Sequence, residues 1–365
     1  MDAERLTNIQ LPQRITNALL LNASFIDNLG LMHGKTGIGI YFFHLARETQ
    51  NQIYEDYGGE LIDEIYDEIT TQTSCDFESG LAGIGWGIEY LVQNKFIDAD
   101  TDEVLEEFDN RIIHEITHHA PDDAGILQGI SGYIVYFLIR IKNGSKRKPV
   151  LKRALLKAVL LLQKNIDRNI VGINHLWKEP EKFDITWNYN SALWVLAELY
   201  HEGLYKRETV QTLKKLLSVH KDYSSLPQLH SHRLVFALII EKLRKLRNEN
   251  LFDSDLAELS IQLTTEIKRE TIREELEPNS AFFRNGASGI SNIYKQLFLL
   301  TRIAIYEIES TYWKSYILEL PLSDQGYAGF FMDKKNEDKA FGILNGLAGI
   351  GLTEMKLIIN QITQS

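Results

Sequence analysis

The chain has 365 residues, of which 44% are hydrophobic and 24% charged, and its formal net charge is −11. This composition is typical of a globular protein with a sizeable core, and the acidic balance argues against nucleic acid as the main partner. The one cysteine, Cys75, excludes an internal disulfide and any site that needs two thiolates from this chain.

The first residues of the sequence and the length of its apolar runs indicate where in the cell the protein is expected. Residues 1–13 are acidic and polar, where a secretory signal would have a basic start and an apolar stretch. No apolar run approaches the roughly 20 residues that span a bilayer, since even residues 150–162 contain Lys152, Arg153 and Lys157. We therefore expect a cytoplasmic protein with no membrane partner.

Apolar residues recur at helical spacing along most of the chain, for example at Phe108, Ile112 and Ile116, which predicts an all-α protein. Within this pattern one motif recurs, which consists of a glycine, two further residues, a second glycine and then an apolar helix. In chain order it occupies residues 34–37, 80–83, 129–132, 286–289 and 346–349. Most neighbouring copies stand roughly 50 residues apart, a period that suits helical hairpin repeats.

The long gap between the third and fourth copies has room for two more units without the glycines. Residues 187–199 and 226–243 are the candidates, which makes seven units. The helices between the copies carry charge on one face. The pattern predicts one domain over residues 1–365, an α/α toroid of about seven inner and seven outer helices with the glycine-rich starts at one rim. Glycine pairs at helix starts let a backbone or a ligand approach closely, and both explanations stay open.

A different motif occurs at residues 114–118, where His114, Glu115 and His118 fit the His-Glu-x-x-His signature of zinc metallopeptidases. In such enzymes the two histidines bind zinc and the glutamate is the general base. On a helical wheel His114 and His118 lie opposite the apolar face, and no third ligand follows in the usual way. A metallopeptidase with these two metal ligands is kept as an alternative.

The glycine motifs resemble those of a known protein family. Gly-Leu-Ala-Gly-Ile-Gly at 80–85 and again at 346–351, and Asn-Gly-Ala-Ser-Gly-Ile at 285–290, resemble the repeats of lanthionine synthetase C proteins. The likeness runs in the correct order from about Leu31 to Leu357. It implies an α/α toroid of seven inner and seven outer helices. It also implies the activity of the best-known members, which add a cysteine thiol of a precursor peptide to a dehydrated Ser or Thr.

In those members zinc, held by two Cys and one His, lowers the pKa of the thiol. Where the sixth repeat of the family reads Cys-His-Gly, this chain has Arg284, Asn285 and glycine, and the fifth-repeat stretch at 227–233 contains no cysteine. Cys75 precedes the second repeat and is a poor substitute. We expect no zinc and no other cofactor, and hence a pseudo-cyclase that binds a precursor peptide, or a peptide-modifying enzyme, in the toroid bowl.

The same comparison of repeats gives candidate site residues. Arg284 and Asn285 stand in place of zinc ligands, and Tyr189 and Asn190 stand where the fourth repeat commonly has His-Gly; these four are candidates for substrate binding. A guanidinium suits carboxylate or phosphate, although a salt bridge across the rim is the alternative role of Arg284.

The candidate catalytic residues are Asp123, His230 and His232. Asp123 lies close to the place of a family aspartate, and the two histidines lie in the fifth unit, where they are alternatively ordinary loop residues. Two further enzymes stay open. A zinc-independent thioether cyclase would use His or carboxylate bases, and a glycan-active toroid would use paired carboxylates, for which Glu78, Asp123 and Asp324 are available.

Overall fold

The computed structural model describes residues 11–169, 178–218, 226–245, 253–265, 267–321 and 339–355. Within these ranges every regular element is a helix, so the all-α prediction is confirmed. In chain order they are α2 (Leu11–Asn22), η1 (Ala23–Phe25), α3 (Lys35–Thr49), α4 (Gln52–Glu68), α5 (Leu81–Gln93), α6 (Thr101–Val104), α7 (Glu106–His118), α8 (Ile130–Lys142), α9 (Lys148–Asn169), α10 (Asn188–His201), α11 (Lys206–Leu217), α12 (His230–Arg244), α13 (Asp253–Thr264), α14 (Arg269–Glu275), α15 (Ala287–Thr301), α16 (Ala304–Glu319) and α17 (Leu347–Glu354). None of the helices in these ranges is long and apolar enough to cross a membrane.

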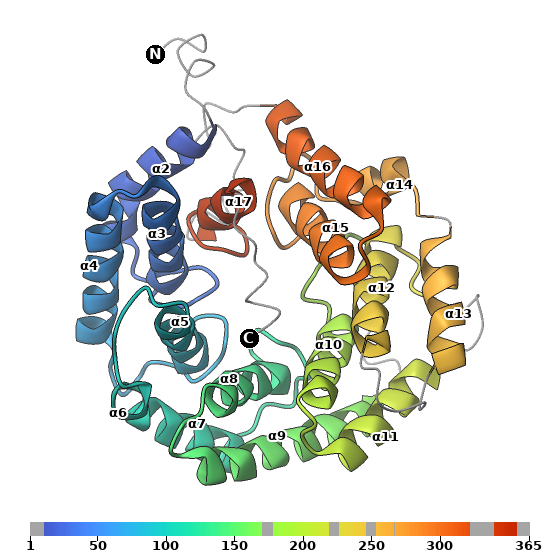
Figure 1. Cartoon of the computed structure of the whole chain (residues 1–365). Helices are drawn as coiled ribbons and strands as arrows, with labels where there is room; N and C mark the ends of the chain where they lie inside the picture. Colours follow the sequence, from blue (N-terminus) through green and yellow to red (C-terminus); the bar gives the residue numbers. More distant parts are fainter. Residues whose placement is uncertain are drawn as a thin grey trace. The chain divides into compact units, whose positions relative to one another are not determined.

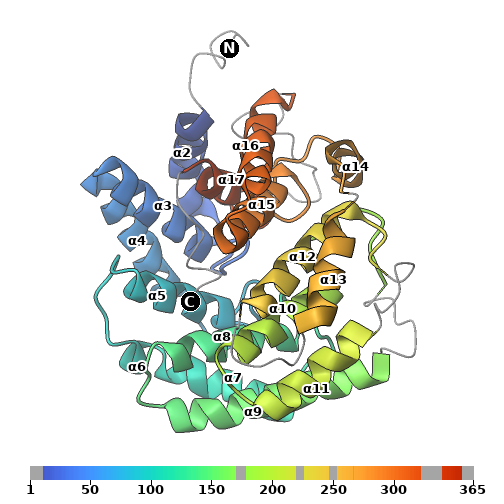
Figure 2. The same cartoon turned by 45° about the vertical axis from the view of Figure 1, so that its right-hand side comes forward.

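The chain divides into two compact units. Unit 1 comprises residues 1–112, 279–289 and 312–365, and Unit 2 comprises residues 113–278 and 290–311. In Unit 1, α3 packs against α4, α5 and α17, and α17 also packs against α2 (Figure 1). In Unit 2, α8 packs on α9, α10 on α11 and α12 on α13, and both views show α12 beside α13 (Figures 1 and 2). The single domain over residues 1–365 stays a prediction.

Each of the seven expected units begins a helix of its own: α3, α5, α8, α10, α12, α15 and α17. These are the buried helices. Residues 35–46 of α3 and 130–141 of α8 are buried without interruption. The predicted units without glycines are confirmed as α10 and α12, which are also buried over most of their length.

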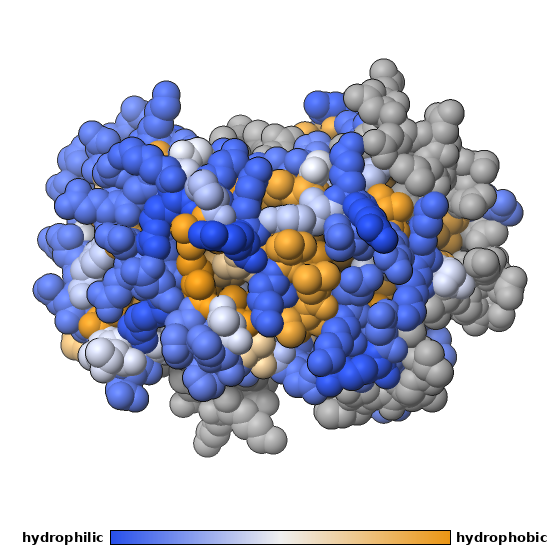
Figure 3. Space-filling model, turned by 90° about the horizontal axis from the view of Figure 1, so that it is seen from below, coloured by the Kyte–Doolittle hydropathy of each residue, from blue (hydrophilic) through white to orange (hydrophobic). Residues whose placement is uncertain are grey.

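The covering helices that follow are amphipathic, and α4 buries only Gly58, Leu61, Ile62 and Ile65. On the face in Figure 3 hydrophilic residues predominate, and hydrophobic residues show between them near its middle. Each hairpin therefore presents one buried and one half-exposed helix, as a repeat of this kind requires to bury its apolar face.

Five helix starts share one hydrogen-bond arrangement. The first amides of the helix donate to carbonyl oxygens seven residues earlier, in the preceding loop, because the first four amides of a helix have no partner inside it. At α17 the Leu347 and Ala348 amides donate to Ala340 and Phe341 at 2.9 and 3.1 Å. The same bond joins Lys35 to Asn28, Leu81 to Ser74, Ile130 to Asp123 and Ala287 to Ser280.

The glycines are needed because this loop backbone lies directly against them. A Cβ at Gly83 would stand 2.2 Å from the carbonyl oxygen of Phe77, and one at Gly349 would stand 1.9 Å from that of Ile343. Neither distance is possible for real atoms. Of the two explanations for the glycine pairs, close packing of the chain on itself is the one that these distances support.

Replacing Gly83 by alanine is expected to lower the free energy of unfolding by about 1–3 kcal/mol, because the added methyl overlaps the loop carbonyl. Urea unfolding followed by circular dichroism measures this. The matched control is Gly59→Ala in α4, where a Cβ meets nothing within 4 Å and alanine should raise helix stability by about 0.5–1 kcal/mol. Equal effects of the two substitutions would contradict the packing account.

A buried histidine makes stability depend on pH. His44 in α3 is buried, and its Nε2 lies 2.7 Å from the Tyr90 hydroxyl in α5. Burial, with a smaller contribution from the charge of Arg47, lowers the pKa of His44 to about 4. Since the unfolded chain has a value of about 6.5, the unfolded state takes up this proton first as the pH falls. The contribution to stability is intact above pH 6.5 and is lost progressively towards pH 4.

We expect the stability difference between the wild type and His44→Gln to shrink by about 3 kcal/mol between pH 7 and pH 4. Comparing the two proteins cancels the titration of all other groups. The measurement is urea unfolding at a series of pH values. A difference that stays constant over that interval would show that His44 titrates alike in both states.

Candidate functional site

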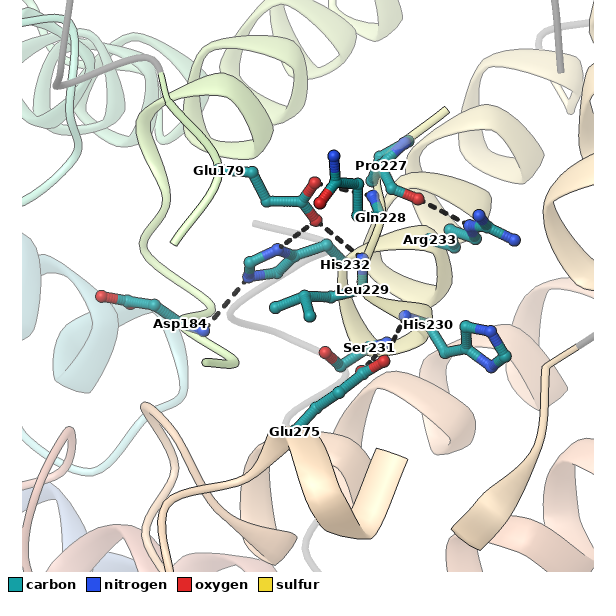
Figure 4. A network of polar contacts seen from close by, with 10 residues as sticks. All are labelled: Glu179, Asp184, Pro227, Gln228, Leu229, His230, Ser231, His232, Arg233 and Glu275. Carbon is teal, nitrogen blue, oxygen red and sulfur yellow. Dashed lines mark hydrogen bonds and ion pairs between the residues drawn. The ribbon is translucent and has the colours of Figure 1, made fainter. Parts of the chain in front are cut away.

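The start of α12 has no glycine, and its amides are capped from elsewhere in Unit 2 (Figure 4). The Glu179 carboxylate accepts hydrogen bonds from the amides of Gln228 at 2.6 Å and Leu229 at 3.0 Å. The Glu275 carboxylate accepts from those of His230 at 2.7 Å and Ser231 at 2.8 Å. Two carboxylates thus take four successive amides at the positive end of the helix dipole, where negative charge is stabilised.

Glu179 is held in its ionised form. Burial by itself raises the pKa of this carboxyl group, but hydrogen bonds from His232, Gln228 and Leu229 outweigh burial and lower the pKa below its ordinary value. The carboxylate is therefore a permanent anion at neutral pH, which strengthens each of its hydrogen bonds.

His232 is fully buried, and both of its ring nitrogens have protein partners. Nδ1 lies 3.0 Å from Oε1 of Glu179, and Nε2 accepts the backbone amide of Asp184 at 3.2 Å (Figure 4). Because a backbone amide can only donate, Nε2 carries the lone pair and Nδ1 the hydrogen. His230 is half-buried, and its Nδ1 accepts the amide of Lys268 at 3.2 Å. The structure thus uses His232 to join two loops, and a catalytic role for either histidine stays a prediction.

These residues do not fit the zinc site that the resemblance would place here. The loop before α12 offers no thiolate, and both nitrogens of His232 are engaged. At the other ligand position stands Arg284, a permanent cation. The described ranges hold no group of three or more His, Cys, Asp or Glu side chains that could bind a metal ion. No chemical step through zinc is supported by this donor set.

The start of α10 holds two of the predicted residues, Tyr189 and Asn190, and a third, Asp123, is bonded to it from the loop before α8. Oδ1 of Asp123 accepts the Gly125 amide and the Asn188 side-chain amide, both at 2.8 Å, and so joins the loop before α8 to α10. Tyr189 donates its hydroxyl to the carbonyl of Leu216 in α11 at 3.0 Å. Burial raises the pKa of Tyr189 far above its ordinary value, so it stays a neutral donor.

Asn190 differs from its neighbours. Its side chain is 1% exposed, yet neither its amide nitrogen nor its amide oxygen has a hydrogen-bond partner. Two further groups share this condition, Trp187 Nε1 at the start of α10 and Ser231 Oγ at the start of α12. The Trp187 and His232 rings lie 4.9 Å apart, and α10 packs against α12. The starts of two neighbouring helices therefore present buried donors and acceptors without partners.

Several of these residues were not predicted from the sequence. Glu179, Asp184, Trp187, Ser231 and Glu275 lie up to about a hundred residues apart, and no motif connects them. The one available signal was the loss of glycine at the fourth and fifth units, which indicates that these helix starts are capped differently.

The remaining substrate-binding candidates lie in Unit 1. The Arg284 amide donates to the carbonyl of Leu344 at 2.9 Å, and Oδ1 of Asn285 accepts from Ser280 Oγ at 3.0 Å. Asp123, Tyr189, Asn190 and the two histidines belong to Unit 2. Asp324, a candidate acid of the glycan alternative, lies outside the described residues.

His114 and His118 are exposed on α7, opposite the buried Ile112 and Ile116, as the helical wheel predicts. Their ring centroids lie 4.7 Å apart, and that of His119 lies 5.6 Å from His114. No described carboxylate or further ligand completes a metal site with them. Among the described residues, the structure therefore adds no third zinc ligand to His114 and His118, which a metallopeptidase would need.

The carboxylate cap of α12 can be tested by Glu275→Ala, which removes the acceptor of two buried amides and should lower the free energy of unfolding by about 2 kcal/mol. Hydrogen exchange at the amides of His230 and Ser231 should accelerate in this variant. Glu274→Ala, one residue away and exposed, is the control and should change neither quantity. Unchanged exchange at both amides after Glu275→Ala would refute the cap.

Comparisons with known proteins bear on the fold and on the repeats. The family model described as lanthionine synthetase C-like protein matches residues 26–188. Among solved structures, nisin cyclase superposes with a TM-score of 0.68 at 15% sequence identity, covering 93% of this chain and 92% of that chain. None of the curated proteins matches the chain.

At this identity the structural likeness shows the fold, and it confirms the predicted α/α toroid. The family match covers the first three glycine repeats, and one of them, within residues 80–85, is among the segments that carry the resemblance. Residues 26–188 are therefore similar to the lanthionine synthetase C-like family, and over the chain as a whole the likeness shown is that of the fold.

Proposed function

We propose that this chain is a zinc-free pseudo-cyclase of lanthipeptide-type peptide modification, which binds a precursor peptide without a metal-activated thiol. The similarity to the lanthionine synthetase C-like family and the shared fold support a role in peptide modification, because known members of that family modify ribosomally made precursor peptides. The zinc-free part rests on Arg284 and on the occupied nitrogens of His232. A cytoplasmic location and a peptide-modifying enzyme as second partner are predictions of the sequence.

The observation that carries peptide binding is the set of unpartnered groups at the starts of α10 and α12. A buried polar group without a partner costs about 1–3 kcal/mol, and such groups in native proteins call for a water, ion or ligand. Asn190 offers both a donor and an acceptor, Trp187 a donor and Ser231 either. A peptide backbone supplies a donor and an acceptor at almost every residue, and so it matches this mixed set.

The other candidate functions have less support. For a glycan-active enzyme, Asp123 already accepts two hydrogen bonds through Oδ1 and belongs to Unit 2, whereas Glu78 belongs to Unit 1. A zinc-independent cyclase shares the peptide-binding step, and consumption of a peptide thiol distinguishes it from a pseudo-cyclase.

The proposal predicts that Asn190→Leu weakens binding of a short fluorescein-labelled peptide containing Cys, Ser and Thr by about tenfold or more, measured by fluorescence anisotropy. Stability should not fall, because Asn190 has no hydrogen bond to lose. The contrast is Asn165→Leu, an equally buried asparagine whose side chain donates to Asp122 O at 2.9 Å. That variant should lose stability and keep peptide affinity while folded.

Two outcomes would contradict the proposal. Equal peptide affinity of the wild type and Asn190→Leu would remove the α10 start from the binding site. About one zinc ion per purified chain, measured by elemental analysis, would contradict the zinc-free assignment. Loss of the free thiol from a peptide that also contains a dehydrated Ser, counted by alkylation, would indicate a cyclase.

A further inference from the structure

Unit 1 exposes the three large apolar side chains that are the most solvent-accessible in the described part of the chain. Leu21 in α2 is 72% exposed, Phe25 in η1 is 84% exposed and Ile53 in the first turn of α4 is 68% exposed. Single exposed apolar residues are ordinary on a protein surface, whereas a group of them marks an interaction site. These three residues are called the apolar patch below.

A contact between α2 and α4 gathers the members of the apolar patch. The Tyr57 hydroxyl in α4 donates to the carbonyl of Leu20 at 3.4 Å and lies 3.3 Å from Oγ of Ser24. Leu20 and Ser24 each directly precede a member of the patch in the sequence. Ile53 lies one helical turn before Tyr57, and so on the same side of α4. The patch therefore surrounds one contact within Unit 1.

Acidic side chains continue the surface along α4. This helix of 17 residues has seven acidic residues and no Lys or Arg. Four exposed acids recur at alternating spacings of four and three residues, which places them in one line opposite the buried face of the helix. They are Asp56, Glu60, Asp63 and Asp67, called the acidic stripe below, and Ile53 stands at its N-terminal end.

The described residues supply no positive charge to the acidic stripe. Lys35 of α3 pairs with Glu64 and Glu68, both at 2.8 Å, on a different side of α4. None of the four stripe residues has an ion pair within the described ranges. Like charges three and four residues apart destabilise a helix, so a cationic partner would relieve a repulsion that the chain itself leaves in place.

Nothing in the described part of Unit 1 covers this surface. Among the described elements α4 packs extensively only on α3, and Figure 1 shows α4 on the outside of that helix. The exposed face of α4 thus combines apolar side chains at one end with unbalanced negative charge along its length.

We propose that the apolar patch and the acidic stripe form a docking surface for a basic amphipathic helix of another protein. The helix places an apolar side chain against Phe25 and Ile53 and sets lysines or arginines along the carboxylates. A helix fits because its own residues three and four apart have the spacing of the stripe, so aligned charges meet in register. A second copy of this chain fits poorly, since its own stripe is also negative. This inference is independent of the proposed peptide modification.

A synthetic helix tests the surface. The probe is a fluorescein-labelled peptide of about 18 residues, or five helical turns, with leucines near one end and lysines at the spacing of the stripe. The control peptide has the same composition with its lysines scattered around the helix. We expect the chain to bind the ordered peptide about tenfold more tightly than the scattered one by fluorescence anisotropy. Equal affinities overturn the proposal, because only net charge would then be recognised.

Two substitutions separate the apolar patch from exposed apolar residues in general. Phe25→Ser should weaken binding of the ordered peptide by about tenfold, and its folding should be intact because the side chain is 84% exposed. Leu160→Ser in α9, where the side chain is 46% exposed, is the matched control and should bind as the wild type does. Unchanged affinity of Phe25→Ser removes the apolar patch from the site and overturns the proposal.

The acidic stripe is tested by the quadruple variant Asp56→Asn, Glu60→Gln, Asp63→Asn and Asp67→Asn. It should bind the ordered peptide about tenfold or more weakly, and its binding should lose most of its dependence on salt. The matched control changes four exposed acids of other helices to Gln, namely Glu107, Glu270, Glu274 and Glu307. It alters net charge equally and should keep the affinity, and an equal loss in both quadruple variants overturns the proposal.

Two measurements on the chain alone complete the test. The quadruple stripe variant should unfold about 2 °C higher than the wild type because the repulsion is removed, and a lower midpoint would contradict the electrostatic argument. Sedimentation equilibrium should show a monomer at the concentrations used for binding. A dimer that Phe25→Ser dissociates would assign the surface to a second copy of this chain and overturn the proposed partner.

Discussion

The structure depends on how the first amides of its buried helices are capped. A buried helix cannot leave these groups to water, because each unsatisfied amide costs free energy comparable to a lost hydrogen bond. At five starts the preceding loop folds back and supplies carbonyls seven residues earlier. The backbones then lie so close that no side chain fits between them, and glycine is required at those positions.

The α12 start meets the same requirement in another way. There the carboxylates of Glu179 and Glu275 replace the loop carbonyls and bring segments distant in sequence to the helix. Because side-chain carboxylates accept these amides in place of loop carbonyls, the start of α12 does not need glycine. The cost is that His232 becomes part of the cap, with one nitrogen on Glu179 and the other on the Asp184 amide. In this cap both ring nitrogens of His232 already have protein partners.

The buried polar groups fall into two kinds. Most, such as the hydroxyl of Tyr189 and the ring of His232, tie one element to another and are fully occupied. A few, among them Asn190 in Unit 2 and His33 in Unit 1, are just as buried but lack a partner on at least one atom. In a closely packed protein such groups are rare, and both occur in the first turn of a buried helix or directly before it. Other unpartnered atoms lie within helices, among them Nδ1 of His44 in α3 and Nε1 of Trp313 in α16.

The sequence by itself determined the helical class, the repeat and both units without glycine, because helical periodicity and glycine spacing are local properties of the chain. It also placed His114 and His118 on the exposed face of α7. Only the tertiary structure decided which side chains cap α12 and which polar groups lack partners. Glu179 and Glu275 are far apart in sequence and carry no motif, and a hydrogen-bond partner is a property of space. For the same reason nothing in the sequence indicated that His33 is held by Glu78, since that pair forms only when two loops meet.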